Sequence, residues 1–173
     1  MKDDNLHKRI EAAANTNSSR ILEVNISSQR MTLTDGKRVL AVYPVSTSRY
    51  GIGNAEGSNQ TPLGLHRLVE KYGADAPTGR IFESRKDTGK IWKPGMSREN
   101  MILTRILRLE GLEAGVNKGK GIDSYARYIY IHGTNNEEMI GTPISHGCIC
   151  MRNDDIIGLF DSVTEGDLVI IHQ

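Results

Sequence analysis

The 173-residue sequence lacks a long hydrophobic run, an excess of basic residues and a series of spaced cysteines. No apolar stretch approaches the roughly 20 residues that a membrane-spanning helix requires, so we expect no membrane span. The 22 lysines and arginines are balanced by 21 aspartates and glutamates. This balance argues against a nucleic-acid partner, because phosphate neutralisation usually needs a basic excess. The two cysteines are separated by one residue, so we expect free thiols rather than a strained disulfide.

The first twenty residues also lack the apolar segment of a secretory signal. We therefore expect a cytoplasmic protein, or a periplasmic one if the chain is a truncated form that has lost an export signal. The length favours a single folded domain with its own core. We expect residues 1–19 to be a polar N-terminal extension with a short helix over 3–14, and residues 20–173 to form the domain.

Hydrophobic residues alternate with polar ones along much of the chain, which predicts strands. In residues 20–26 Leu22, Val24 and Ile26 alternate with polar side chains, and Asp35-Gly36 marks a hairpin turn further on. The other predicted strands cover residues 31–33, 38–45, 65–69, 128–132 and 167–172. Residues 101–109 fit either a helix or a strand, and the strand-like segment that follows them favours a strand. The sequence therefore predicts a mainly β fold with a few short helices.

Two other segments carry specific expectations. Asn153 is a good N-cap for a helix that would bury Ile156, Ile157, Phe160 and Val163. Residues 76–98 are locally basic and contain proline and glycine, which favours a solvated loop. The alternative is a lid whose charges meet an anionic substrate.

Residues 144–153, ISHGCICMRN, bring both cysteines next to a histidine and a glycine. A cysteine attacks a carbonyl as the thiolate, so Cys148 would need a base such as His146 or His132, which ends a predicted strand. In an extended segment His146, Cys148 and Cys150 would share one face. Gly147 would permit a close backbone approach, and the backbone N–H groups around it could stabilise an oxyanion.

Two other interpretations of these residues stay open from spacing alone. The three side chains of His146-Gly-Cys148-Ile-Cys150, together with His132, could hold zinc, although structural sites usually separate cysteines by two to four residues. Alternatively, both cysteines could be packed thiols and both histidines simple hydrogen-bonding residues.

The motifs HGT at residues 132–134 and SHGCICM at 145–151 resemble the signature of the L,D-transpeptidase (YkuD-type) catalytic domain. The predicted opening hairpin and the TPLG sequence at residues 61–64 agree with this resemblance, which extends over roughly residues 20–172. It implies a β-sandwich with a few short helices, no cofactor and no metal. It also implies that residues 20–173 are a catalytic domain whose partner is a peptidoglycan stem tetrapeptide.

Carried over to this sequence, the resemblance makes Cys148 the nucleophile and His132 its base. The backbone carbonyl of Gly133 would orient the imidazole. The oxyanion pocket would be shaped by Ser145, His146, Gly147 and Cys148. Tyr130 is a further candidate for substrate binding.

One position departs from the family pattern. The residue two after the nucleophile is usually arginine, and here it is Cys150. We expect Arg152 to replace it in substrate binding, because on a strand it would share a face with Cys148 and Cys150.

The expected reaction is cleavage of the L-to-D bond of a tetrapeptide with release of D-Ala. The absence of an export signal favours an L,D-carboxypeptidase that uses water in murein recycling. The first alternative is a transpeptidase that forms cross-links. The second is a zinc-bound structural module or a non-catalytic wall-binding module.

Overall fold

The computed structural model describes residues 20–97 and 99–173 and contains one ten-stranded sheet. The first strands are β1 (Ile21–Asn25), β2 (Arg30–Thr34), β3 (Val39–Pro44), β4 (Gly64–Tyr72), β5 (Arg80–Glu83) and β6 (Lys86–Ile91). They are followed by β7 (Ile102–Gly111), β8 (Tyr130–Gly133), the 3₁₀ helix η1 (Glu137–Met139), β9 (Ile149–Met151), α2 (Asn153–Ser162) and β10 (Leu168–His172). The mainly β class predicted from the alternation is confirmed. The helix expected over residues 3–14 and the rest of the N-terminal extension lie outside the described residues.

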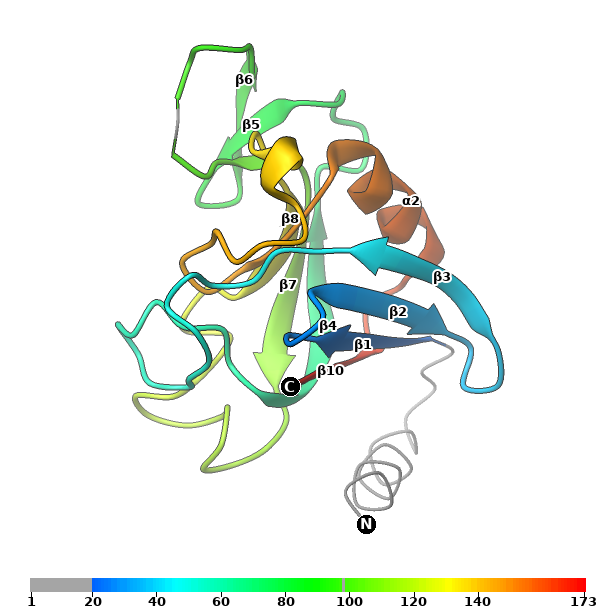
Figure 1. Ribbon diagram of the computed structural model, residues 1–173, viewed down its shortest axis with the longest axis vertical. Coiled ribbons are helices and arrows are strands. Elements are labelled where there is room, and N and C mark those ends of the chain that lie inside the picture. Colours follow the sequence, from blue (N-terminus) through cyan, green and yellow to red (C-terminus); the bar gives the residue numbers. More distant parts are fainter. Residues whose placement is uncertain (1–19, 98) are drawn as a thin grey trace.

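The strands are ordered β3-β2-β1-β10-β4-β7 along the sheet, and β7 also pairs with β8, which pairs with β9. The sheet curls back on itself, because the segment after β3 meets β9 through reciprocal backbone hydrogen bonds between Ser46 and Cys150. The predicted strand over residues 101–109 is β7, which pairs with β4, β5 and β8 and so lies at the centre of the sheet (Figure 1).

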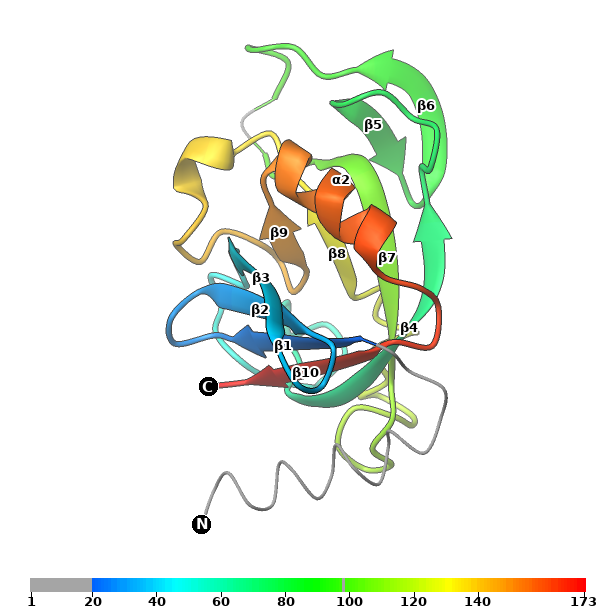
Figure 2. The same ribbon diagram turned by 90° about the vertical axis from the view of Figure 1, so that its right-hand side faces the viewer.

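The main core fills the space inside this curled sheet. Figure 2 shows β1, β2, β3 and β10 running across the direction of β7 and β8, with α2 against the outer end of the latter pair. Apolar side chains of both groups of strands and of α2 meet in one buried cluster that includes Leu22, Met31, Leu107, Ile131 and Ile149. Burial of these side chains from water is the main stabilising contribution to the fold.

Two sequence expectations need correction. The basic segment 76–98 is not a plain loop, because β5 and β6 form a hairpin within it that projects beyond the sheet (Figure 1). Helix α2 has Arg152 as its N-cap, and Asn153 is its first residue. The helix buries Ile156 and Phe160 as expected, but Leu159 takes the buried position expected of Ile157.

The helices in the described part of the chain are short. None of them is long and apolar enough to span a membrane.

Candidate active site

His132 lies near the end of β8 and is almost completely buried, at 2% exposure. Its Nδ1 atom lies 2.7 Å from the backbone carbonyl oxygen of Gly133. A carbonyl can only accept a hydrogen bond, so the proton of the neutral ring is on Nδ1 and the lone pair is on Nε2. The contact that the family resemblance implies between these two residues is therefore present.

Gly133 itself occupies a position where no side chain fits. A Cβ atom there would lie 2.5 Å from Asn153 Oδ1 and 2.7 Å from the backbone oxygen of Leu103. The glycine of the HGT motif thus allows β8 to pack closely against β7 and the start of α2 at the residue that follows His132.

The parallel pairing of β8 with β9 brings the histidine and cysteine side chains of the two motifs to one face of the sheet. His132 is in register with Cys150, and Ile131 with Ile149. Because side chains alternate along a strand, Ile131 and Ile149 point into the main core and His132 and Cys150 point to the opposite face. Cys148, two residues before Cys150, reaches the same side of the sheet next to Tyr130.

Cys148 is half-buried, whereas Cys150 is fully buried, and both are free thiols. The Cys148 Sγ atom lies 3.5 Å from the backbone oxygen of Tyr128 and donates to it. The Cys150 Sγ atom lies 3.9 Å from Nε2 of His132. Among the described residues, the His132 base is therefore in contact with the Cys150 thiol, and the half-buried Cys148 thiol donates to a carbonyl.

Burial determines the protonation states of this group. It lowers the pKa of His132 to about 4, against the opposing effect of the Gly133 carbonyl. It also raises the pKa of Cys148 to about 11, although a backbone hydrogen bond from Tyr130 and the charge of Arg127 act in the other direction. At neutral pH the resting site consequently contains a neutral imidazole and a neutral thiol rather than an ion pair.

The turn before Cys148 is built by Ser145 and Gly147. The Ser145 hydroxyl donates to the backbone oxygen of Cys148 and accepts from the Gly147 N–H. Gly147 has a φ of +122°, and a Cβ atom there would lie 3.2 Å from the Gln60 backbone oxygen. The expected close backbone approach is therefore confirmed. Because the Gly147 N–H is already bonded, the backbone N–H of Cys148, which has no partner among the described residues, is the better oxyanion donor.

His146 does not face the nucleophile. Its Nε2 atom lies 2.7 Å from a guanidinium nitrogen of Arg49, and its ring lies 5.5 Å from that of Tyr50. Because arginine only donates, Nε2 of His146 accepts this bond. The second candidate base is therefore occupied by Arg49, which leaves His132 as the base on the same face as Cys148.

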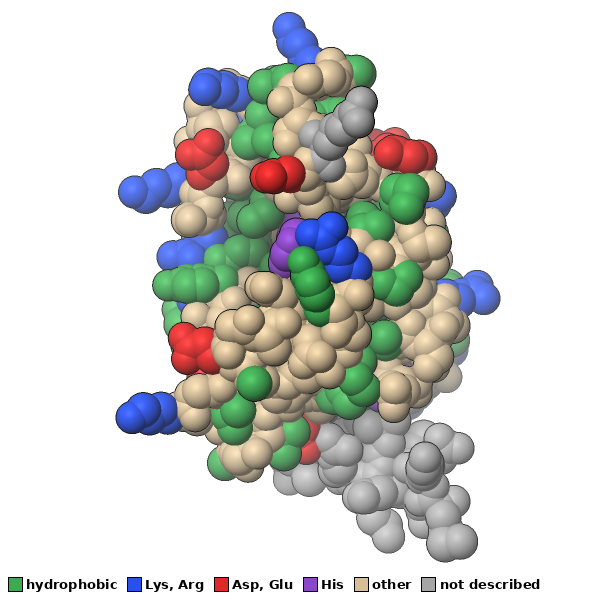
Figure 3. All heavy atoms as spheres, turned by 60° about the vertical axis from the view of Figure 1, so that its left-hand side comes forward, with side chains coloured by type: hydrophobic (Ala, Val, Ile, Leu, Met, Phe, Trp, Pro, Cys, Tyr) green, Lys and Arg blue, Asp and Glu red, His purple; other side chains and the backbone are tan. Residues whose placement is uncertain are grey.

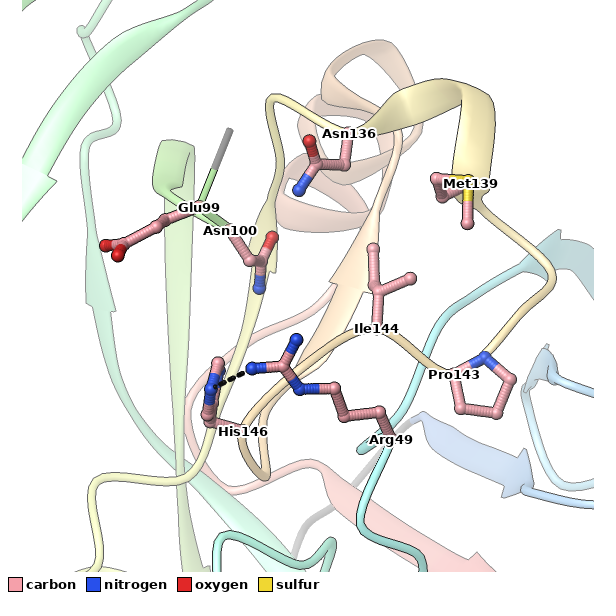
Figure 4. A pocket seen from close by; sticks show the side chains of 8 residues that line it. All are labelled: Arg49, Glu99, Asn100, Asn136, Met139, Pro143, Ile144 and His146. Atoms are coloured by element: carbon pink, nitrogen blue, oxygen red, sulfur yellow. Dashed lines mark hydrogen bonds between the residues drawn. The ribbon is translucent and has the colours of Figure 1, made fainter. Parts of the chain in front are cut away.

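Arg49 and His146 line a pocket of about 680 Å³. Figure 3 shows a histidine and a basic side chain at the edge of a hollow in this face of the molecule. Figure 4 shows the Arg49 guanidinium reaching toward His146, with the Asn100 amide nearby and Ile144 on the other side. The remaining lining residues are Glu99, Asn136, Met139 and Pro143.

The other side of Cys148 is formed by the β5–β6 hairpin and Tyr130. Arg85, in the turn of the hairpin, donates to the Tyr130 hydroxyl at 2.9 Å and lies 5.2 Å from the ring centre of Tyr128. Tyr130 is buried, at 3% exposure, and packs beside Cys148. The hairpin thus places the Arg85 guanidinium on the Tyr130 hydroxyl, and Tyr130, the candidate residue for substrate binding, packs beside Cys148.

The strand position expected for Arg152, on which its predicted role in substrate binding was argued, is wrong. Strand β9 ends at Met151, and Arg152 is an exposed residue at the start of α2 instead of continuing the strand. Three residues of the site were not predicted from the sequence, namely Arg49, Arg85 and Asn100. They lie on segments that follow no recognisable motif. Folding of the sheet brings Arg49 to His146, Asn100 to Cys150 and Arg85 to Tyr130.

A metal site receives no support from the geometry. In residues 20–97 and 99–173, no group of three or more histidine, cysteine, aspartate or glutamate side chains is arranged to hold a metal ion.

The comparison with known families agrees with this geometry. Residues 19–171 match the model of the YkuD family, the L,D-transpeptidase catalytic domain. The chain belongs to this family. It is 33% identical over 140 residues to the probable L,D-transpeptidase ErfK/SrfK of Salmonella typhimurium, covering 76% of this chain and 40% of that protein. It is 31% identical over 143 residues to the probable L,D-transpeptidase YcfS of Escherichia coli, covering 79% and 38%.

Solved structures of L,D-transpeptidases share the fold. An L,D-transpeptidase from Mycobacterium tuberculosis superposes with a TM-score of 0.55 at 19% identity, covering 90% of this chain and 58% of that one. The L,D-transpeptidase LdtMt1 in complex with imipenem gives a TM-score of 0.55 at 22% identity, covering 90% and 59%. The chain thus spans about two fifths of these two curated relatives and three fifths of these two solved chains.

Proposed function

We propose that this L,D-transpeptidase family domain is a cysteine acyl-transfer enzyme that cleaves the L-to-D bond of peptidoglycan stem tetrapeptides and releases D-Ala. The observation that carries the proposal is the placement of a half-buried thiol and a neutral, buried imidazole on one face of β8 and β9, within the matched family domain. A neutral base of this kind can accept the thiol proton as the new bond forms.

The first half-reaction forms a thioester. Cys148 leaves the Tyr128 carbonyl and passes its proton to Nε2 of His132 while Sγ attacks the substrate carbonyl. The resulting oxyanion accepts a hydrogen bond from the Cys148 N–H, a type of interaction often worth about 3–4 kcal/mol. The C–N bond then breaks, and the His132 imidazolium returns the proton to the amine of the departing D-Ala.

The second half-reaction frees the enzyme. His132 takes a proton from the acceptor, which attacks the thioester carbonyl, and Cys148 departs as a thiolate that recovers the proton. With water the product is a tripeptide acid, and with an amine it is a new peptide bond. Following the expectation from the sequence, we favour water as the acceptor and a cytoplasmic setting, with cross-link formation by an amine as the alternative.

The pocket around Arg49 suits one end of such a peptide. The guanidinium shares the pocket with the apolar side chains Met139, Pro143 and Ile144. In the described part of the chain Arg49 has no acidic side chain within ion-pair distance, and its side-chain hydrogen bond is to Nε2 of His146. We assign it to the C-terminal carboxylate of the terminal D-Ala, because an arginine fork binds a carboxylate through two parallel hydrogen bonds.

Incubation with a murein tetrapeptide tests the proposal. We expect release of D-Ala by the wild-type protein and its loss in Cys148→Ala, with a tripeptide acid as the second product. Addition of an amine acceptor separates hydrolysis from transfer, because a cross-linked product appears only if the amine competes with water. No release of D-Ala by the folded wild-type protein would contradict the proposal.

A carbapenem offers an independent test. LdtMt1 has been solved in complex with imipenem. If Cys148 is the nucleophile here, imipenem should open its β-lactam ring on Sγ and raise the protein mass by one drug molecule. The same exposure should leave the mass of Cys148→Ala unchanged.

A further inference from the structure

Cys150 is an unusual side chain for its position, since it is fully buried, chemically reactive in principle, and unused by the acyl-transfer steps above. It stands in register with His132 on the neighbouring strand. Its Sγ atom has two polar neighbours, Asn100 Nδ2 at 3.2 Å and His132 Nε2 at 3.9 Å. The question is what a buried thiol contributes between an amide and the catalytic base.

The direction of each hydrogen bond can be assigned from donor and acceptor chemistry. The Thr134 hydroxyl donates to Asn100 Oδ1 at 2.6 Å, which fixes the amide so that Nδ2 points to Cys150. Sγ of Cys150 accepts from that amide, so its own S–H is free to donate. The lone pair on His132 Nε2 is the acceptor on that side, because Nδ1 carries the ring proton.

On this basis we propose that Cys150 is a positioning residue for His132. The Cys150 thiol, oriented by Thr134 and Asn100, donates to Nε2 of His132 and holds the imidazole in the orientation that accepts the Cys148 proton. The ring is then held from both sides, by the Gly133 carbonyl at Nδ1 and by the thiol at Nε2. The inference rests on the proposed acyl-transfer function, in which His132 is the base.

A thiol suits this role because it is a weak donor. It keeps the resting ring in place, yet the Cys148 proton can displace it when a substrate arrives. A stronger donor would compete with the nucleophile for the same lone pair. Burial raises the pKa of Cys150 to about 12, so it remains protonated and able to donate.

The surroundings of His132 contain few other groups that could produce the same effect. The titratable side chains on its face are Cys148 and Cys150, both protonated near neutral pH, and Tyr130, whose pKa is raised by burial and whose hydroxyl accepts from Arg85; its partner on β7 is the apolar Ile106. A change in the titration of His132 after substitution of Cys150 would therefore report on their contact.

The test follows the His132 ring by NMR titration of the full chain, together with the rate of Cys148 acylation. A donor to the neutral ring lowers the pKa, so Cys150→Ala should raise the pKa of His132 by about one unit. It should also slow acylation about tenfold at unchanged KM, because the ring is no longer held in place. Cys150→Ser, which keeps a donor, should recover part of both effects.

Ile149→Val is the matched control, since it removes a small volume from the same strand on the opposite face. It should leave both the titration and the acylation rate unchanged. If Cys150→Ala does not fold, Thr134→Val removes the hydroxyl that orients Asn100 and should shift the His132 titration in the same direction.

An unchanged His132 titration in folded Cys150→Ala would overturn the inference, as would an equal shift in Ile149→Val. The failure of the proposed function is distinguishable, because it would abolish acylation in the wild-type protein while the titration still reports on the contact between Cys150 and His132.

Discussion

In the resting site Nε2 of His132 lies 3.9 Å from Sγ of Cys150, and the nucleophile Cys148 donates instead to the backbone oxygen of Tyr128. The base and the nucleophile are thus each bonded to another group before substrate binds. Both are also neutral, because burial lowers the pKa of the imidazole and raises that of the thiol. Thiolate formation is therefore coupled to substrate attack instead of preceding it, and this relationship has measurable consequences.

The first prediction concerns the reactivity of Cys148 without substrate. Only the thiolate reacts with iodoacetamide, so the alkylation rate should continue to rise through pH 9 as the population of thiolate grows toward a pKa of about 11. Cys150 should remain unmodified in the folded protein because it is fully buried. Mass spectrometry of the modified protein measures both. A rate that is already constant between pH 5 and pH 7 would indicate a preformed ion pair and contradict this description.

A second prediction concerns stability in mild acid. His66 and His132 are buried, and burial lowers the pKa of each to about 4. An unfolded histidine, with a pKa near 6.5, binds a proton that the folded one does not. The contribution to stability is therefore complete above pH 6.5 and is lost as the pH falls toward 4, by up to about 1.4 kcal/mol per pH unit for each histidine.

Urea unfolding between pH 7 and pH 5 measures this slope. In His66→Gln the part of the slope of unfolding free energy against pH that comes from the two histidines should fall by about half. This holds whatever the absolute stability of the variant. A slope equal to that of the wild-type protein would show that His66 is not held neutral by burial.

The third prediction tests the turn before the nucleophile. Gly147→Ala places a side chain at a φ of +122° and 3.2 Å from the Gln60 carbonyl, so it should destabilise the fold by about 2 kcal/mol and reduce acylation. Gly158→Ala is the matched control, because Gly158 lies in α2 with open space around its Cβ position. It should stabilise the protein by about 0.5–1 kcal/mol. Equal effects of the two substitutions on urea unfolding would refute the assigned role of Gly147.

The fourth prediction concerns Arg49. In Arg49→Gln the KM for the tetrapeptide should rise about tenfold, because a charge-assisted contact with the terminal carboxylate is lost. The kcat should change less, and a substrate with an amidated C-terminus should bind both forms alike. Arg38→Gln removes an exposed arginine elsewhere and serves as the control. A tenfold effect that persists with the amidated substrate would assign Arg49 to another part of the ligand.

Much of the fold could be predicted from the sequence because apolar and polar residues alternate along several of the strands. The opening hairpin and the strand that ends near His132 follow this pattern, whereas β7 is buried along nearly all of its length and was favoured as a strand because of the segment that follows it. The hairpin of β5 and β6 was missed because β6 is mostly polar and exposed and β5 contains only two adjacent buried residues, Ile81 and Phe82, so no alternation marks them as strands. Ile157 was misassigned for a related reason, since apolar periodicity alone does not specify which side of a helix faces the core.

Only those residues of the candidate site that belong to a recognisable sequence motif could be predicted. His132, Gly133 and Cys148 were singled out from two short motifs, and the structure places the first two on β8 and Cys148 immediately before the adjacent β9. Arg49 and Asn100 arrive from segments about 50 to 100 residues away in the sequence, through the curling of the sheet. Arg152 was misplaced because β9 stops one residue before it. Such long-range placement depends on register and strand ends, which local patterns do not specify.

The central claim is that Cys148 carries the acyl group. The most direct measurement is the intact mass of the protein, quenched in acid during turnover of a murein tetrapeptide and then mapped by peptide. The account predicts an added tripeptide acyl group on Cys148, with D-Ala released in at least an equal amount, and neither in Cys148→Ala. Release of D-Ala by Cys148→Ala, or an acyl group mapped to Cys150 in the wild-type protein, would contradict it.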